Sequence, residues 1–157
     1  MDKTSVLFVC LGNICRSPLA EGIFVTRLQE QGLSQHFRVD SCGTGGWHAG
    51  EPPHHGSVAI AQDRGIDITH QRSRKLKTSD FQNFDWIIAM DASNERDLRS
   101  AAPSNFPQDR IVRLLDFADN TDRSDVPDPY YVGGFDRVFD LIDSGCQGFL
   151  TSLNPAV

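Results

Sequence analysis

The feature that most constrains this chain is the segment of residues 10–17, CLGNICRS, which lies between an apolar run and a helix start. Residues 6–9 are all apolar and predict a buried strand, and Ser17 followed by Pro18 is typical of a helix N-terminus. In such a strand–loop–helix unit, backbone N–H groups can point inward at an anion beside the helix N-terminus. The segment therefore predicts an α/β domain with an anion-binding loop at the end of its first strand.

Cys10 and Arg16 would give this loop a nucleophile and a cation. A helix N-terminus, inward amides and a nearby cation favour the thiolate, which is the nucleophilic form of cysteine. Arg16 offers a planar fork of donors that matches two phosphate oxygens. Gly12 and Asn13 tolerate the left-handed backbone that a tight loop needs, and Ser17 can cap the helix or donate to the thiolate. We expect consecutive residues to bind phosphate, namely Leu11, Gly12, Asn13, Ile14, Cys15, Arg16 and Ser17.

A cysteine that ends an apolar strand is also common as a small core residue, and the spacing to Arg16 can arise by chance. None of the other three cysteines has an arginine at that offset. The segment lacks the Gly-Lys-Ser/Thr ending of a Walker loop and the Gly-x-Gly-x-x-Gly dinucleotide pattern. The strand before it and the helix start after it favour the catalytic interpretation.

Alternating strand and helix signals predict the fold. Apolar runs predict strands at residues 5–10, 37–41, 85–90 and 110–114, and the intervening and final helices are expected at 18–31, 57–64, 92–100 and 135–153, the last interrupted near Gly145. A basic run, Arg72, Arg74, Lys75 and Lys77, lies in a connector. We expect a four-stranded parallel sheet with helices on both faces, flavodoxin-like with strand order 2-1-3-4, and ligands at the carboxyl ends of its strands.

Composition limits the class of protein. With 157 residues, 39% of them hydrophobic, residues 1–157 are expected to form one domain with its own core. A net charge of −6 argues against a general nucleic-acid or membrane-surface binder. No apolar run suggests a signal peptide or a membrane span, and the four cysteines suggest no disulfide framework, so we expect a cytoplasmic protein. His54 and His55 are adjacent and lack zinc-ligand spacing, so no metal is expected.

A nucleophile and an arginine still need a proton donor for the leaving oxygen. Asp128 is a candidate because it precedes a proline in the long polar loop of residues 116–134, and long loops tend to be functional. The alternative is a solvated acidic loop, in which Asp119, Asp122 and Asp125 are interchangeable with it. The residues of this loop leave both interpretations open.

Three ordered motifs together resemble the low-molecular-weight protein tyrosine phosphatases: VCLGNICRSP at residues 9–18, AMDxSN at 89–94 and DPYY at 128–131. The resemblance extends over essentially the whole chain. It implies hydrolysis of protein phosphotyrosine and small aryl phosphates through a phosphocysteine. Cys10 would attack phosphorus, Arg16 and the loop amides would hold the phosphate oxygens, and Asp128 would protonate the departing phenol and then activate water.

The resemblance also implies supporting residues. Asn13 would hold the loop in a strained geometry, Ser41 and His70 would hydrogen-bond to Asn13, and Ser17 would steady the thiolate. A surface histidine is the alternative for His70. Asp91 fits an aspartate at the end of the central strand, although capping of the next helix explains it equally well.

Aromatic residues would form the substrate pocket. Trp47, Tyr130 and Tyr131 resemble a pocket wall for the tyrosyl ring, although Trp47 could be a packing residue and the two tyrosines could be phosphorylation targets. Cys15 would form a reversible disulfide with oxidised Cys10, or simply fill space under the loop. Cys42 and Cys146 are interpreted as core thiols.

The expected partners are phosphotyrosine-containing proteins, with inorganic phosphate as product and inhibitor, no nucleic acid and no membrane, and the protein is expected to be a monomer without a cofactor. Two alternatives remain. Arsenate reductases of this fold need downstream resolving cysteines, and the sequence has none between Cys42 and Cys146. A phosphoprotein-binding module without catalysis would not need Cys10, Arg16 and Asp128 together.

Overall fold

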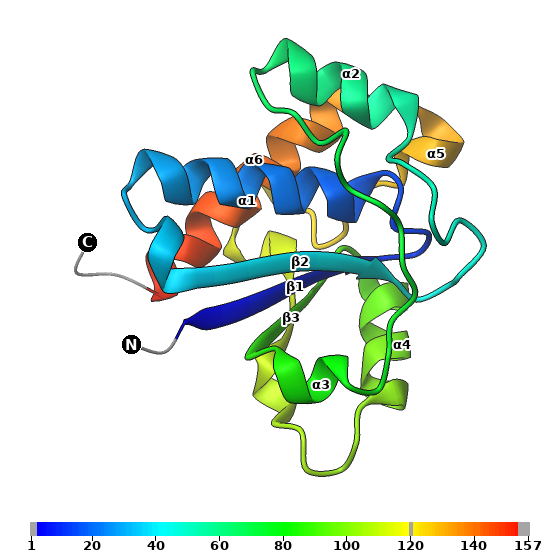
Figure 1. Ribbon diagram of the computed structural model, residues 1–157, viewed down its shortest axis with the longest axis vertical. Helices are drawn as coiled ribbons and strands as arrows, with labels where there is room; N and C mark the ends of the chain where they lie inside the picture. Colours follow the sequence, from blue (N-terminus) through cyan, green and yellow to red (C-terminus); the bar gives the residue numbers. More distant parts are fainter. Residues whose placement is uncertain (1–2, 120, 154–157) are drawn as a thin grey trace.

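The strands form a parallel sheet whose carboxyl ends all point to one edge. The computed structural model describes residues 3–119 and 121–153, so the predicted domain boundaries at residues 1 and 157 lie outside the described residues. Within the described residues the sheet has four strands, β1 (Thr4–Cys10), β2 (Phe37–Gly43), β3 (Trp86–Ala89) and β4 (Ile111–Arg113), in the order β2-β1-β3-β4 (Figure 1). The predicted α/β class and strand order are confirmed.

Strand register sets which residues meet at that edge. Cys10 pairs with Gly43 of β2, and Val9 pairs with Ala89 of β3. Ala89 in turn pairs with Arg113 of β4. The loops that follow the four strands therefore begin side by side, with Cys10 near the centre of the edge.

Helices cover both faces of the sheet (Figure 1). One face carries α1 (Arg16–Glu30), α2 (His55–Asp63) and α6 (Phe135–Leu153), and the other carries α3 (Asp80–Asn83) and α4 (Ala92–Ala101). Short elements complete the described chain: α5 (Pro129–Val132) and the 3-10 turns η1 (Ser34–His36), η2 (Gln108–Arg110) and η3 (Leu114–Phe117).

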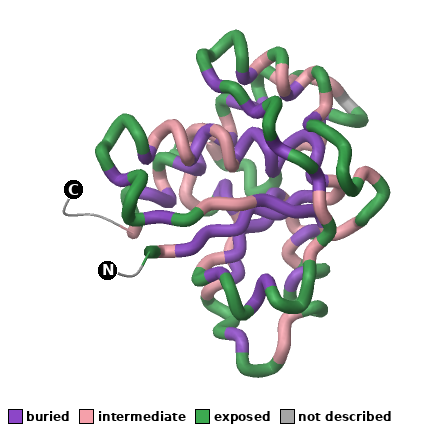
Figure 2. Tube along the Cα trace, in the orientation of Figure 1, coloured by how far each residue is buried: buried purple, intermediate pink, exposed green. Residues whose placement is uncertain are grey.

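Two apolar cores result from the alternation of side chains along the buried strands. Phe8 of β1 packs with Phe24 of α1 and Phe149 of α6 in the larger core. Leu7 of the same strand points to the other face and packs with residues of α3 and α4. The central strands are accordingly buried along most of their length (Figure 2). The rigid layers hold the first strand, and hence Cys10, in a fixed position.

The expected interruption of the last helix near Gly145 is wrong, because α6 runs without a break through this position. A Cβ atom at Gly145 would lie 2.6 Å from Leu114 Cγ, and one at Gly148 would lie 1.7 Å from the Phe117 carbonyl oxygen. The glycines therefore allow α6 to pack closely against η3 instead of ending the helix. In the part of the chain that the structure describes, no helix is both long and apolar enough to cross a membrane.

Candidate active site

The loop between β1 and α1 directs hydrogen-bonding groups at the sulfur of Cys10. The backbone N–H of Asn13 donates to Cys10 Sγ at 3.3 Å, and Ser17 Oγ lies 3.1 Å from the same sulfur. Cys10 is buried, with 3% of its surface exposed. The sulfur is therefore reached from the loop side by an amide and a hydroxyl, as expected for the nucleophile of such a loop.

Asn13 fixes the shape of this loop. Its backbone is left-handed, with φ = 58°, and its Nδ2 donates to Ser17 Oγ at 2.8 Å and to Ser41 Oγ at 3.0 Å. Its Oδ1 accepts from the backbone N–H of Arg74 at 3.0 Å. The contact expected with Ser41 is present. The contact expected with His70 is wrong, because His70 is exposed and the amide of Asn13 is already bonded to the other three partners.

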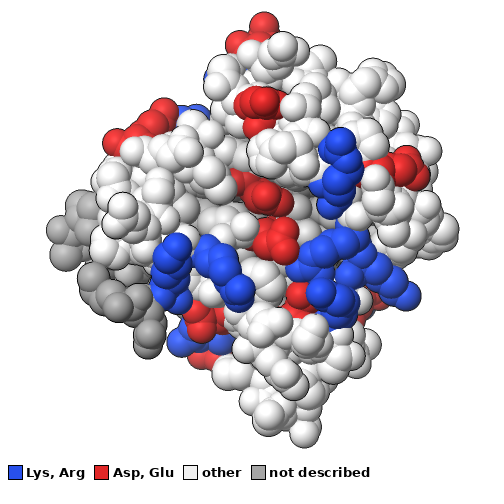
Figure 3. Space-filling view, in the orientation of Figure 1, with Lys and Arg blue, Asp and Glu red and all other residues white. Residues whose placement is uncertain are grey.

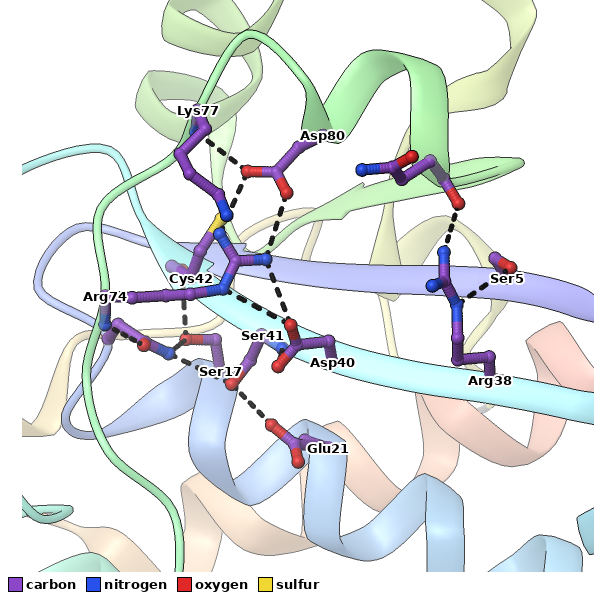
Figure 4. Close-up of polar contacts among 12 residues, drawn as sticks. Ser5, Ser17, Glu21, Arg38, Asp40, Ser41, Cys42, Arg74, Lys77 and Asp80 are labelled. Carbon is purple, nitrogen blue, oxygen red and sulfur yellow. Dashed lines mark hydrogen bonds and ion pairs between the residues drawn. The ribbon is translucent and has the colours of Figure 1, made fainter.

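Arg74, which the sequence analysis did not select, anchors the segment that bonds Asn13 (Figure 4). Its guanidinium lies between Asp40 of β2, at 3.0 Å, and the buried Asp80 of α3, also at 3.0 Å. Asp80 additionally accepts from the backbone N–H of Lys77 at 2.8 Å. A basic run is a weak sequence signal, since nothing in it distinguishes the half-buried arginine that forms two ion pairs from its exposed neighbours.

Glu21 of α1 extends the same network from below the loop (Figure 4). Ser41 Oγ donates to Glu21 Oε1 at 2.6 Å, which leaves the hydroxyl oxygen free to accept from Asn13. Burial raises the pKa of Glu21 to about 7, although its hydrogen bond to Ser41 acts in the opposite direction. Ser73 supports the loop from another side, since its hydroxyl donates to the Gly12 carbonyl at 3.0 Å.

Arg16 is buried at the start of α1 and holds two loops together. Its Nη1 donates to Asp91 Oδ2 at 2.6 Å and to the Val126 carbonyl at 3.0 Å, and its Nη2 lies 3.4 Å from Asp128 Oδ2. Its Nε is buried and has no hydrogen-bond partner among the described residues. Burial acts to lower the pKa of Arg16, but the charges of Cys10, Asp91 and Asp128 outweigh it and raise the pKa above its ordinary value. The guanidinium is therefore a permanent cation beside the sulfur.

Asp91 caps a helix, as one of its two interpretations expected, and also pairs with Arg16, which the sequence did not predict. Its Oδ2 pairs with Arg16, and its Oδ1 accepts from the backbone N–H of Asn94 at 2.8 Å and so caps α4. The carboxylate thus orients the arginine and begins a helix at the end of β3.

The structure distinguishes Asp128 from the other acidic residues of its loop. Asp128 caps α5 through Tyr130 N–H, at 3.1 Å, and turns its other oxygen toward Arg16. Asp125 is bonded elsewhere, to Ala92 N–H at 3.0 Å and to Arg113 at 3.1 Å, while Asp119 and Asp122 are exposed. Within the loop, the candidate proton donor is therefore the carboxylate that lines the cavity over Cys10.

One cavity of about 240 Å³ joins the loop to the aromatic residues. Its lining consists of Cys10, Leu11, Gly12, Ile14, Cys15, Trp47, His48, Asp128, Tyr130 and Tyr131. Trp47 is 72% exposed, and Tyr130 and Tyr131 are 51% and 71% exposed, so the aromatic side chains form the mouth while the sulfur lies at the bottom. His48 was not predicted; its Nδ1 lies 3.1 Å from Glu51 Oε2, and its ring lies 6.1 Å from that of Tyr130.

The other cysteines differ in their surroundings. Cys15 lines the cavity with Cys10, and burial, followed by the charges of Asp128 and Cys10, raises its pKa to about 12. Cys42 and Cys146 are buried in the two cores, as predicted, and burial raises the pKa of both thiols. Cys15 is therefore the thiol that shares a cavity with the candidate nucleophile.

A buried thiol, a charged arginine and a carboxylate around one loop at the end of a parallel sheet define a cysteine-dependent phosphatase. Residues 5–157 match the family described as low molecular weight phosphotyrosine protein phosphatase, and the chain belongs to this family. The protein is a protein-tyrosine-phosphatase, and its substrates are phosphoproteins.

Named relatives agree with this assignment. The chain is 48% identical to the low molecular weight protein-tyrosine-phosphatase YfkJ of Bacillus subtilis over 95% of each chain. It is 46% identical to PtpA of Staphylococcus epidermidis over 92% of this chain and 90% of that one. The crystal structure of YfkJ aligns with this structure over 99% of this chain and 97% of the YfkJ chain, with a TM-score of 0.94. A Drosophila arginine phosphatase has the same fold, with 32% identity, 97% and 99% coverage and a TM-score of 0.89.

Proposed function

We propose that Cys10, Arg16 and Asp128 carry out phosphotyrosine hydrolysis in two steps. The observation that carries this assignment is their convergence: the sulfur and the carboxylate line one cavity, and the guanidinium lies 3.4 Å from that carboxylate. In the first step the Cys10 thiolate attacks phosphorus, the bond from phosphorus to the phenolic oxygen breaks, and Asp128 gives its proton to that oxygen.

In the second step water attacks the phosphocysteine. Asp128, now a carboxylate, takes a proton from the water, and the phosphorus–sulfur bond breaks to release inorganic phosphate and the thiolate. Ser17, at 3.1 Å from the sulfur, would stabilise the departing thiolate. Arg16 and the amides of residues 11–17 would bind the phosphate oxygens in both steps, so inorganic phosphate should also act as a competitive inhibitor.

The walls of the cavity support a tyrosyl phosphate as the substrate. Trp47, Tyr130 and Tyr131 surround its mouth, and Ile14 and Leu11 add apolar surface nearer the sulfur. A flat aromatic ring can pack against such walls. A Drosophila arginine phosphatase has the same fold, so a phosphoarginine peptide is the alternative substrate to compare with a phosphotyrosine peptide. Arsenate reduction has less support, since the two thiols outside the loop, Cys42 and Cys146, are buried in the cores.

We also propose that the enzyme works as a cytoplasmic monomer without nucleic-acid or membrane partners. Thiol chemistry at Cys10 needs a reducing compartment, and each of the four cysteines is free in the described structure. The net charge of −6 disfavours a general polyanion partner.

The experiment that tests the assignment measures hydrolysis of para-nitrophenyl phosphate, a phosphotyrosine peptide and a phosphoarginine peptide under reducing conditions. We expect vanadate-sensitive turnover of the first two substrates and its loss in Cys10→Ser, which should still bind vanadate or phosphate. Substantial turnover by Cys10→Ser would show that Cys10 is not the nucleophile. A preference for the phosphoarginine peptide would overturn the substrate assignment and leave the nucleophile in place.

A further inference from the structure

The segment between α2 and α3 carries exposed cations that the proposed mechanism does not use. Arg72, Lys75 and Lys77 are exposed, and among the residues that the structure describes none of them forms an ion pair. Lys and Arg side chains gather over this segment in the surface view (Figure 3). We call these three residues the basic edge. In a protein of net charge −6, such a cluster gives a local positive potential on an otherwise acidic protein.

Arg74 does not belong to the basic edge, although it lies in the same run. Its charge is balanced by Asp40 and Asp80, and the two ion pairs fix the backbone of its segment. Arg72 donates instead to the Thr69 and Gln71 carbonyls, which leaves its charge uncompensated. One arginine of the run is thus structural, while its neighbours present positive charge to solvent on a rigid backbone.

Backbone contacts place the basic edge beside the mouth of the cavity. Lys75 forms a parallel bridge with Gly43 at the end of β2, and Ser73 exchanges backbone hydrogen bonds with Gly50 and Glu51, each at 2.8 Å. A Cβ atom at Gly46 would lie 3.3 Å from Lys75 Cδ. Trp47, the next residue, lines the cavity. The basic edge therefore adjoins the loop that forms the Trp47 side of the mouth.

We propose that the basic edge is a docking site for acidic residues that flank phosphotyrosine in the protein substrate. This inference rests on the proposed function, since it concerns the part of the substrate outside the cavity. Aspartate or glutamate side chains near the phosphotyrosine would lie against Lys75 and its neighbours, where opposite charges attract. The basic edge would thus favour substrates with acidic flanking sequences.

The test compares two phosphotyrosine peptides of equal length, one with Asp and Glu flanks and one with Ser and Gln flanks. We expect kcat/KM to favour the acidic peptide by about three- to tenfold at low salt, as two or three exposed charge pairs would give, and the preference to disappear at about 0.5 M salt. Lys75→Glu should remove or reverse the preference, with turnover of para-nitrophenyl phosphate unchanged.

Lys3→Glu is the matched control, because it makes the same change in charge at the far end of β1, where Lys3 is exposed. This variant should keep the preference. Equal kcat/KM of the wild type for the two peptides would overturn the docking site, and so would an equal loss of the preference in Lys75→Glu and Lys3→Glu. In either case, continued turnover of para-nitrophenyl phosphate would leave the proposed function standing. No turnover of any substrate would instead refute the proposed function. Inhibition by single-stranded DNA that Lys75→Glu abolishes, without a peptide preference, would assign the edge to nucleic acid and overturn the proposal.

Discussion

Replacing Asn13 separates two contributions to the stability of the catalytic loop. The side chain makes three hydrogen bonds in a buried position, to Ser17, Ser41 and the Arg74 N–H, at distances from 2.8 to 3.0 Å. At about 1 kcal/mol for each hydrogen bond, both Asn13→Ala and Asn13→Gly should lower the free energy of unfolding by about 3 kcal/mol. Alanine carries a further cost, because φ is 58° and a left-handed backbone costs about 1–2 kcal/mol in a residue with a Cβ.

Glycine avoids this strain but loses about 0.5–1 kcal/mol more conformational entropy when it folds. The two effects together predict that Asn13→Gly is more stable than Asn13→Ala by roughly 1 kcal/mol, although glycine is the more flexible residue. In a chain of this size that difference corresponds to about 2–4 °C in Tm.

Urea unfolding followed by fluorescence measures both free energies, and the initial rate with para-nitrophenyl phosphate measures the activity. We expect both stability and kcat/KM to decrease from the wild type to Asn13→Gly and then to Asn13→Ala. Ser34→Ala and Ser34→Gly form a reference pair, because Ser34 is exposed in η1, far along the chain from the loop. If Asn13→Ala equals or exceeds Asn13→Gly in stability, the left-handed backbone does not determine the residue at this position.

Three further predictions concern other groups of the site. Asp128→Ala should lower kcat for phenyl phosphate by about a hundredfold or more and for activated aryl phosphates by less, and equal losses across leaving groups would contradict its role as the acid. Burial raises the pKa of Glu21 from 4.5 to about 7, so between these pH values the folded protein holds a proton that the unfolded chain has lost. The free energy of unfolding should therefore decrease as pH rises from 4.5 to 7, and Glu21→Gln should reduce that decrease by about 2–3 kcal/mol; parallel pH profiles for the two proteins would refute this. After peroxide and then thiol treatment, Cys15→Ser should regain a smaller fraction of its own starting activity than the wild type, whereas equal recovery would contradict a protective disulfide with Cys10.

The sequence predicted the parts of the molecule that depend on local pattern. Apolar runs bounded by glycine and polar residues located all four described strands, and the spacing of Cys10 and Arg16 located the loop between β1 and α1. The predicted helix interruption at Gly145 was wrong, because the sequence alone does not distinguish a glycine that ends a helix from one that allows a neighbouring element to pack closely. The Leu114 side chain that decides between them comes from another part of the chain.

The support of the loop was harder to predict, because it depends on long-range contacts. His70 was selected by resemblance, yet the Asn13 oxygen is bonded to the backbone N–H of Arg74, a group that every residue but proline possesses. No side-chain pattern can reveal such a donor. Glu21 was missed for a similar reason, since a carboxylate within a helix is ordinarily a solvated residue and here its hydrogen bond to Ser41 lies under the loop.

Two carboxylates contact Arg16, and their distances from it distinguish their roles, although both belong to aspartates. Asp91 lies 2.6 Å from the guanidinium and Asp128 lies 3.4 Å from it. The shorter contact is made by a carboxylate that also caps α4 at the end of β3, so its position is fixed by the sheet. The longer contact is made from a loop that reaches the cavity from β4, by a carboxylate that also lines the space above Cys10. Because a buried arginine needs a partner whether or not phosphate is bound, the fixed carboxylate can hold it while the other is left to exchange a proton with the substrate.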